Sequence, residues 1–252
     1  CEAHPGNPWG HYMLGLSEWR GGRLDAAEAA LARGLELNED FAKARRNLAR
    51  VLMSAERHEE ALALLQAAAP ADLALGEHQR LLGRVLHNLE RPGEAMGAYA
   101  LALSANPKDA WALNNLGLIL VEGERFEDAL SAFAVAADLD PANATFLNNL
   151  GVVLERRGHG GQAVEAYRQA LELDSGHDRA RVSLARVEAL EPGTESALDL
   201  NTLAALTADE LAAGRFPWSL ESPPALTPDS EEIAAVEPGE GVGEEPIGAE
   251  GA

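Results

Sequence analysis

Asparagine and basic side chains that could bind a peptide recur at one spacing in this 252-residue chain. Asn47, Asn115 and Asn149 are separated by multiples of 34 residues. An asparagine amide offers both a donor and an acceptor, which is what the main chain of an extended peptide requires of a partner. Further amide, basic and aromatic residues lie close to the same register. The full candidate set for peptide binding is Trp9, Tyr12, Lys43, Arg46, Asn47, Arg50, Arg80, Arg84, Asn114, Asn115, Asn148 and Asn149.

The sequence holds no group of residues typical of catalysis. Its seven histidines are scattered, and none pairs with another at metal-ligand spacing with a third ligand nearby. The glycine clusters at 158–161 and 239–243 lack the Lys-Ser or Lys-Thr pair of a phosphate-binding loop. We therefore expect a binding protein rather than an enzyme, with no cofactor and no metal.

A 34-residue repeat must position the candidate residues. Counted from Pro8, the eighth, twentieth and twenty-seventh positions of five successive repeats hold only Gly or Ala, fifteen residues in all. The seventh and twenty-fourth positions hold large apolar residues throughout. Large side chains that alternate with small ones suit helices that pack closely, ridges into grooves.

Each repeat has the apolar spacing of two helices. In the fourth repeat, Leu113, Leu116 and Leu120 follow one helical face, and a second helical run begins at Phe126 after a turn at 123–125. Pro107 and Pro141 then stop the second helix near the end of the third and fourth repeats. The pattern predicts helix, tight turn and second helix in every repeat.

This pattern resembles the tetratricopeptide repeat, whose signature over 34 residues is a bulky residue, Leu-Gly, Ala, an aromatic residue, Ala and Pro. The fourth repeat carries most of it, in Leu116, Gly117, Ala129, Phe133, Ala136 and Pro141. The family's Trp at position four is missing, because that position holds His11, Arg45, Gln79, Leu113 and Leu147. The resemblance implies an all-α, right-handed α-solenoid of five helix-turn-helix repeats at 8–41, 42–75, 76–109, 110–143 and 144–177.

The resemblance also implies where a partner binds, since this family turns one face of each first helix toward a concave groove. Here that face is aromatic in the first repeat, basic in the second and third, and rich in asparagine in the last two. We expect a protein-protein interaction scaffold that binds an extended, acidic peptide. A sequence pI near 4.6 argues against nucleic acid as the partner. The recurring asparagines are similar to the ladder of asparagines along the repeat groove of O-GlcNAc transferase. The alternative function is therefore the substrate-binding module of a larger enzyme such as a glycosyltransferase.

The residues after the fifth repeat change in character. Residues 178–190 read as a capping helix, which a solenoid needs at its end. Residues 191–252 hold fourteen acids and one base, Arg215, and so carry −13 of the net charge of −21. We expect this acidic tail to be mostly disordered and able to contact the basic part of the groove. A short helix near 199–213, with Thr207 and Glu210 as a capping box, either docks on the solenoid end or binds a partner.

The first residues allow two interpretations. Residues 1–7 are either the end of a preceding repeat, which the 34-residue phase favours, or the tether of a bacterial lipoprotein lipidated at Cys1. A lipoprotein of this kind would act in pilus or secretion assembly. No uncharged apolar run is long enough to cross a bilayer. The compartment stays open: a cytoplasmic location is favoured, and a periplasmic or membrane-anchored one is the alternative.

Overall fold

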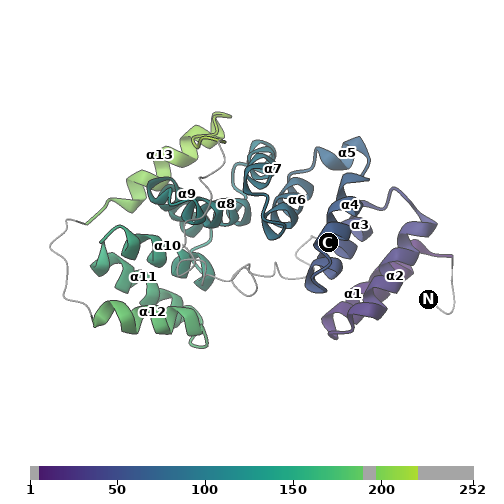
Figure 1. Ribbon diagram of the computed structural model, residues 1–252, viewed down its shortest axis with the longest axis horizontal. Helices are drawn as coiled ribbons and strands as arrows, with labels where there is room; N and C mark the ends of the chain where they lie inside the picture. The colour runs from purple at the N-terminus through teal and green to yellow at the C-terminus, as the bar shows by residue number, and fades with distance from the viewer. Residues whose placement is uncertain (1–5, 190–196, 221–252) are drawn as a thin grey trace. The chain divides into compact units, whose positions relative to one another are not determined.

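The computed structural model describes residues 6–189 and 197–220, and every regular element in these residues is an α-helix (Figure 1). The chain divides into two compact parts. The N-terminal part reaches to Ala98 and the C-terminal part begins at Tyr99, so that α7 (Pro92–Ala105) belongs to both. Each part is described by itself. The expected disorder at 191–196 and 221–252, and both interpretations of Cys1, concern residues outside those described.

The N-terminal part is built from helix pairs in which each helix packs on the next along the chain. Its helices before α7 are α1 (Pro8–Arg20), α2 (Leu24–Leu37), α3 (Ala42–Ser54), α4 (His58–Gln66), α5 (Pro70–Leu73) and α6 (Gly76–Asn88). α1 packs on α2, α2 on α3, α3 on α4, and α4 on α6. The first helices α1, α3 and α6 also contact one another in sequence, which places their exposed faces side by side.

The C-terminal part follows the same plan. Its helices after α7 are α8 (Ala110–Glu122), α9 (Phe126–Leu139), α10 (Ala144–Arg156), α11 (Gly160–Leu173), α12 (Asp178–Glu188) and α13 (Leu200–Ala212). Consecutive helices from α8 to α12 pack on each other, and α8 and α12 both contact α10. The five first helices begin at Pro8, Ala42, Gly76, Ala110 and Ala144, the residues from which the 34-residue spacing is counted.

The turn between the two helices of each repeat uses the left-handed backbone conformation at one position. Gly22 and Gly158 hold it with φ of 72° and 82°, and Glu56, Glu90 and Glu124 hold it with φ between 56° and 59°. A side chain in this conformation is strained by about 1 kcal/mol. The three glutamates show that the helix-turn-helix packing imposes the turn even where no glycine relieves it.

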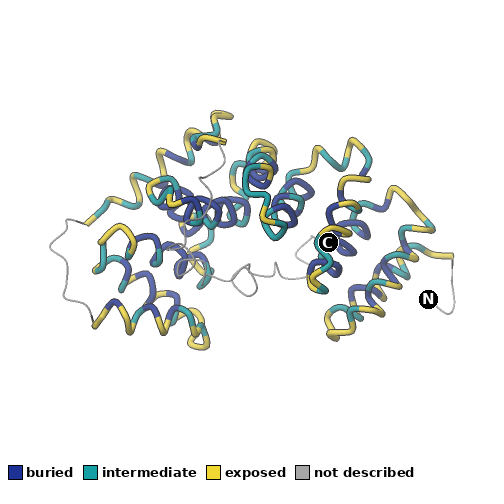
Figure 2. Tube along the Cα trace, in the orientation of Figure 1, coloured by how far each residue is buried: buried dark blue, intermediate teal, exposed yellow. Residues whose placement is uncertain are grey.

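Small residues are required where the two helices of a repeat cross. A Cβ on Gly117 would lie 2.6 Å from Cε1 of Phe133, and a Cβ on Gly151 would lie 2.6 Å from Cε1 of Tyr167. The Phe133 and Tyr167 rings are almost fully buried. The large side chain at position twenty-four therefore packs directly against the glycine at position eight. In Figure 2 the buried segments lie along these helix contacts.

The second repeat departs from the others at its end. α4 stops at Gln66, and a separate short helix, α5, starts with Pro70 at its first turn. Proline lacks the N–H that a helix interior needs and disfavours helical backbone at the preceding residue. The signature of the family has its proline at the position of Leu73, and in this repeat the proline that ends the second helix is Pro70, three residues earlier. The second helix is shortened accordingly.

Two helices follow the fifth repeat. In α12, Arg186 donates from Nε and Nη2 to the two carboxylate oxygens of Glu155 on α10, both over 2.8 Å. α13 packs on α9, the second helix of the fourth repeat. Its N-cap is Asp199, whose side chain accepts from the Thr202 N–H. The expected capping box is wrong, because Thr207 lies inside α13 and its hydroxyl donates to the Leu203 carbonyl.

Candidate functional site

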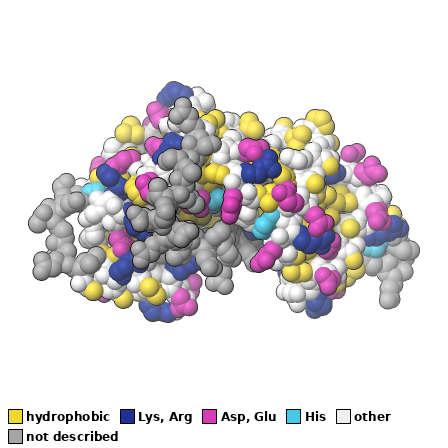
Figure 3. All heavy atoms as spheres, in the orientation of Figure 1, with side chains coloured by type: hydrophobic (Ala, Val, Ile, Leu, Met, Phe, Trp, Pro, Cys, Tyr) yellow, Lys and Arg dark blue, Asp and Glu magenta, His cyan; other side chains and the backbone are white. Residues whose placement is uncertain are grey.

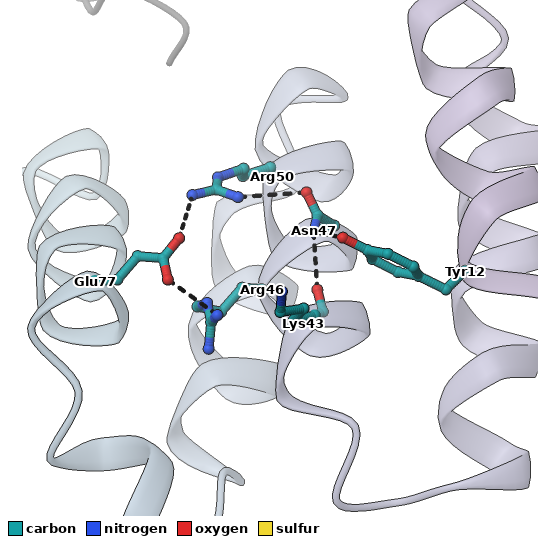
Figure 4. Close-up of polar contacts among 6 residues, drawn as sticks. All are labelled: Tyr12, Lys43, Arg46, Asn47, Arg50 and Glu77. Atoms are coloured by element: carbon teal, nitrogen blue, oxygen red, sulfur yellow. Dashed lines mark hydrogen bonds and ion pairs between the residues drawn. The ribbon is translucent and has the colours of Figure 1, made fainter. Parts of the chain in front are cut away.

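A cluster of basic and amide side chains lies on α3 in the N-terminal part, with Glu77 of α6 opposite it (Figure 4). Lys43, Arg46, Asn47 and Arg50 share one face of α3 because their spacing of three, four and seven follows the helical period. The Arg46 side chain is only 6% exposed and that of Arg50 is 17% exposed. The expected basic stretch therefore exists on one helix face, and its guanidinium groups are largely covered.

One carboxylate holds both of these arginines. Arg46 Nη2 lies 2.9 Å from Oε2 of Glu77, and Arg50 Nη2 lies 3.4 Å from Oε1 of the same residue (Figure 4). The ion pairs join α3 to α6. Glu77 was not among the expected residues, although it holds position two of the third repeat, which the candidate Trp9 holds in the first. In Figure 3, basic and acidic side chains are likewise close together on the surface of this part.

Asn47 connects the basic face of α3 to the aromatic end of the N-terminal part. Its amide nitrogen donates to the Lys43 carbonyl over 2.9 Å and to the Tyr12 hydroxyl over 3.4 Å. Its amide oxygen accepts from Arg50 Nη1 over 3.3 Å. Both ends of the Asn47 amide are thus engaged within the chain, and the side chain is buried.

An aromatic cluster lies beside this network. The Trp9 ring is 4.8 Å from that of Phe41 and 5.6 Å from that of Tyr12, centroid to centroid. Trp9 and Tyr12 were expected at the site, and Phe41, the residue before α3, was not. Trp9 is 53% exposed, so that its ring offers an apolar contact surface next to the basic face of α3.

α6 carries the remaining basic candidates. Arg80 and Arg84 are half-buried and follow Glu77 on one helix face. His78 on the same helix is almost fully buried. Burial lowers its pKa below the ordinary value of 6.5, the Arg46 and Arg45 charges lower it further, and Asp72 and a backbone hydrogen bond with Leu65 oppose the shift.

Position four of the repeat has a structural role that the sequence did not reveal. Arg45 donates from Nη1 to the Ala67 carbonyl over 3.3 Å and from Nη2 to the Glu39 carbonyl. Gln79, at the same position of the next repeat, donates to the Leu73 carbonyl over 2.5 Å. These polar side chains replace the family's tryptophan and satisfy backbone carbonyls near helix ends.

The four candidate asparagines of the C-terminal part form a chain of hydrogen bonds. Asn148 donates to Asn149 over 3.3 Å, Asn149 donates to Asn114 over 2.9 Å, and Asn114 donates to Asn115 over 3.3 Å. All four are at most 5% exposed. The bond from Asn149 to Asn114 joins α10 to α8. The asparagines were expected to face a peptide, whereas here their amides bond to one another, within each helix and, through Asn149 and Asn114, between the two helices.

The part of the chain that the structure describes holds no cluster of three or more His, Cys, Asp or Glu side chains that could bind a metal ion. Likewise, none of its described helices has the length and apolar character needed to cross a membrane.

Comparisons with known proteins agree on one family. The tetratricopeptide repeat family matches residues 12–73, 114–178 and 148–213. YrrB, described as a TPR protein with an unusual peptide-binding site, is 25% identical with a TM-score of 0.52, over 72% of this chain and 94% of YrrB. TTC0263, a thermophilic TPR protein from Thermus thermophilus, is 20% identical with a TM-score of 0.63, over 73% of this chain and 100% of that one. PilF from Pseudomonas aeruginosa is 20% identical with a TM-score of 0.64, over 91% of this chain and 97% of that one. Among curated proteins, none matches the sequence significantly.

Proposed function

Because the chain belongs to the tetratricopeptide repeat family, whose repeats build extended binding surfaces, we propose that the first helices of its N-terminal part bind an extended, acidic segment of a partner protein. One observation carries the proposal. Arg46 and Arg50 converge on a single carboxylate, that of Glu77, and so form a place on the first-helix face that suits a carboxylate. The peptide-binding site of YrrB is consistent with such a role.

The surroundings of this place favour a peptide with several acidic residues. Arg80 and Arg84 continue the basic character along α6, and Lys43 extends it on α3. The exposed ring of Trp9, which packs on Phe41 just before α3, can accept an apolar side chain of the same peptide. Guanidinium groups are well suited to carboxylates, because their planar donors can form two parallel hydrogen bonds.

The proposal is tested with a labelled deca-glutamate peptide and two triple variants of equal charge. Arg50→Gln, Arg80→Gln and Arg84→Gln together remove bases of the first-helix face. Arg33→Gln, Arg57→Gln and Arg91→Gln together remove the same charge outside the first helices. We expect the first variant to bind about tenfold more weakly, since each partly exposed ion pair contributes up to about 1 kcal/mol, and the second to stay close to wild type. Equal losses in both variants would contradict a defined site.

The chain's own C-terminal residues supply the same chemistry. Residues 221–252 contain nine acidic side chains and no Lys or Arg. Tethered to the same chain, they would compete with an acidic partner. A variant that ends at Leu220 keeps α13 and tests this contact. We expect it to bind the peptide more tightly than the full chain at low salt, with a difference that shrinks as salt increases. Equal affinities at low salt would exclude competition by these residues.

A further inference from the structure

Glu77 occupies the place where the proposed function puts the carboxylate of a partner. We propose that Glu77 is an internal pseudo-ligand, which the acidic partner must displace from Arg46 and Arg50. This inference rests on the proposed function and adds its regulation. The geometry supports it, because the two Glu77 oxygens face different arginines, at 2.9 Å and 3.4 Å, as an incoming carboxylate would (Figure 4).

The different exposures of the three side chains favour replacement of the Glu77 carboxylate by that of a partner over breaking of the ion pairs with no replacement. The Arg46 side chain is 6% exposed, and a covered guanidinium that loses its anion carries a large penalty. The Glu77 side chain is 29% exposed, so it can rotate toward water. Glu77 is also the second residue of α6, where the positive end of the helix dipole stabilises its charge. The Arg46 guanidinium is therefore costly to leave without a carboxylate. Glu77 can rotate away when the carboxylate of a partner takes its place.

Competition between Glu77 and a partner for Arg46 and Arg50 favours partners with several acidic residues. A tethered carboxylate acts at an effective concentration in the millimolar range or above. One isolated carboxylate of a partner gains little by replacing it. A segment with several acidic residues can also bring carboxylates to Arg80, Arg84 and Lys43, whereas Glu77 has only one carboxylate to offer. Glu77 therefore raises the number of acidic residues that a peptide needs for binding.

The test compares Glu77→Gln with a matched control, Glu28→Gln, in the full chain. Glu28 on α2 is 31% exposed and pairs with Arg57 over 2.6 Å, so the control also removes one acidic charge and one inter-helix ion pair. The probe is the labelled deca-glutamate peptide. If Glu77 blocks the site for about nine-tenths of the time, its removal increases the affinity about tenfold. Glu28→Gln should bind like wild type.

A second substitution separates displacement from a general charge effect. The gain in Glu77→Gln should shrink when Arg50→Gln is added, because one of the two vacated guanidinium groups is then missing. Should Glu77→Gln fail to fold, Glu77→Asp must show an increased affinity, since the shorter side chain cannot reach both arginines. If Glu77→Gln binds no more tightly than Glu28→Gln while wild type binds the peptide, Glu77 is a structural tie and the inference is wrong. If no variant binds the peptide, the proposed function fails as well.

Discussion

The indole N–H of Trp218 donates to the hydroxyl of Ser131 over 3.0 Å and thereby joins residues 87 positions apart. Trp218 is 4% exposed. Nearby, Arg125 donates from Nη1 to the Ser219 carbonyl over 2.8 Å. Together with the packing of α13 on α9, these contacts fix the segment 197–220 on the second helix of the fourth repeat.

Trp218→Ala should release this segment. We expect the free energy of unfolding to fall by about 3 kcal/mol, as for other buried tryptophans replaced by alanine. Amide hydrogen exchange should accelerate in α13 and in the covered face of α9. Leu206→Ala is the control, because Leu206 lies on α13 but is 62% exposed. If exchange in α13 is unchanged by Trp218→Ala, the segment is held by other contacts.

Asn149→Ala should lower stability as well as any affinity for a peptide. It removes the bond that joins α10 to α8 and leaves the buried Asn114 oxygen without this donor. A buried polar group that loses its partner costs about 1–3 kcal/mol. Urea unfolding measures the loss, with Asn201→Ala on the exposed side of α13 as the control. A stability equal to that of wild type would mean that the asparagine chain does not join the helices.

Gly117→Ala and Gly97→Ala should have opposite effects, although both replace a helical glycine. A Cβ at 117 would lie 2.6 Å from the buried ring of Phe133, whereas a Cβ at 97 would meet nothing within 4 Å. We expect Gly117→Ala to lose about 1–3 kcal/mol through overpacking. Gly97→Ala should gain about 0.5–1 kcal/mol from its better helix propensity. Thermal unfolding measures both, and two shifts of the same sign would contradict the packing described.

The stability of the N-terminal part should depend on pH through His78. Burial and the neighbouring arginines lower the pKa of His78 in the folded state below 6.5, its ordinary value. The unfolded chain then binds more protons than the folded one just below this pH, so stability is lost as pH falls from about 6.5. Urea unfolding between about pH 8 and pH 5 should show this loss. In His78→Gln the pH dependence should be smaller, and an equal slope in both proteins would exclude His78 as its source.

The sequence predicted the family and the all-α repeat fold, and both are confirmed. It could do so because the repeat is a local pattern: small residues such as Gly117 stand at a fixed distance from large ones such as Phe133. The period alone therefore indicates which helices pack together. The early end of α4 was not predicted, although Pro70 explains it.

The details of the candidate site were less accessible from the sequence. Helical periodicity indicates which residues share a face, but side-chain pairing across helices depends on rotamers and on the neighbouring helix. Glu77 could have been identified as a partner of Arg46 from its repeat position. The hydrogen bond between Asn114 and Asn149 could not have been predicted, since an asparagine that faces solvent and one that is covered occupy the same repeat positions in the sequence. The binding roles of the twelve candidate residues stay predictions.

We propose that acidic peptides bind on the first helices of the N-terminal part. Hydrogen exchange of the full chain, with and without saturating deca-glutamate peptide, tests it most directly. We predict slower exchange in α3 and α6, at Ala42–Ser54 and Gly76–Asn88, and unchanged exchange in the second helices α2 and α4. Protection confined to the second helices, or none anywhere at saturation, would contradict the claim.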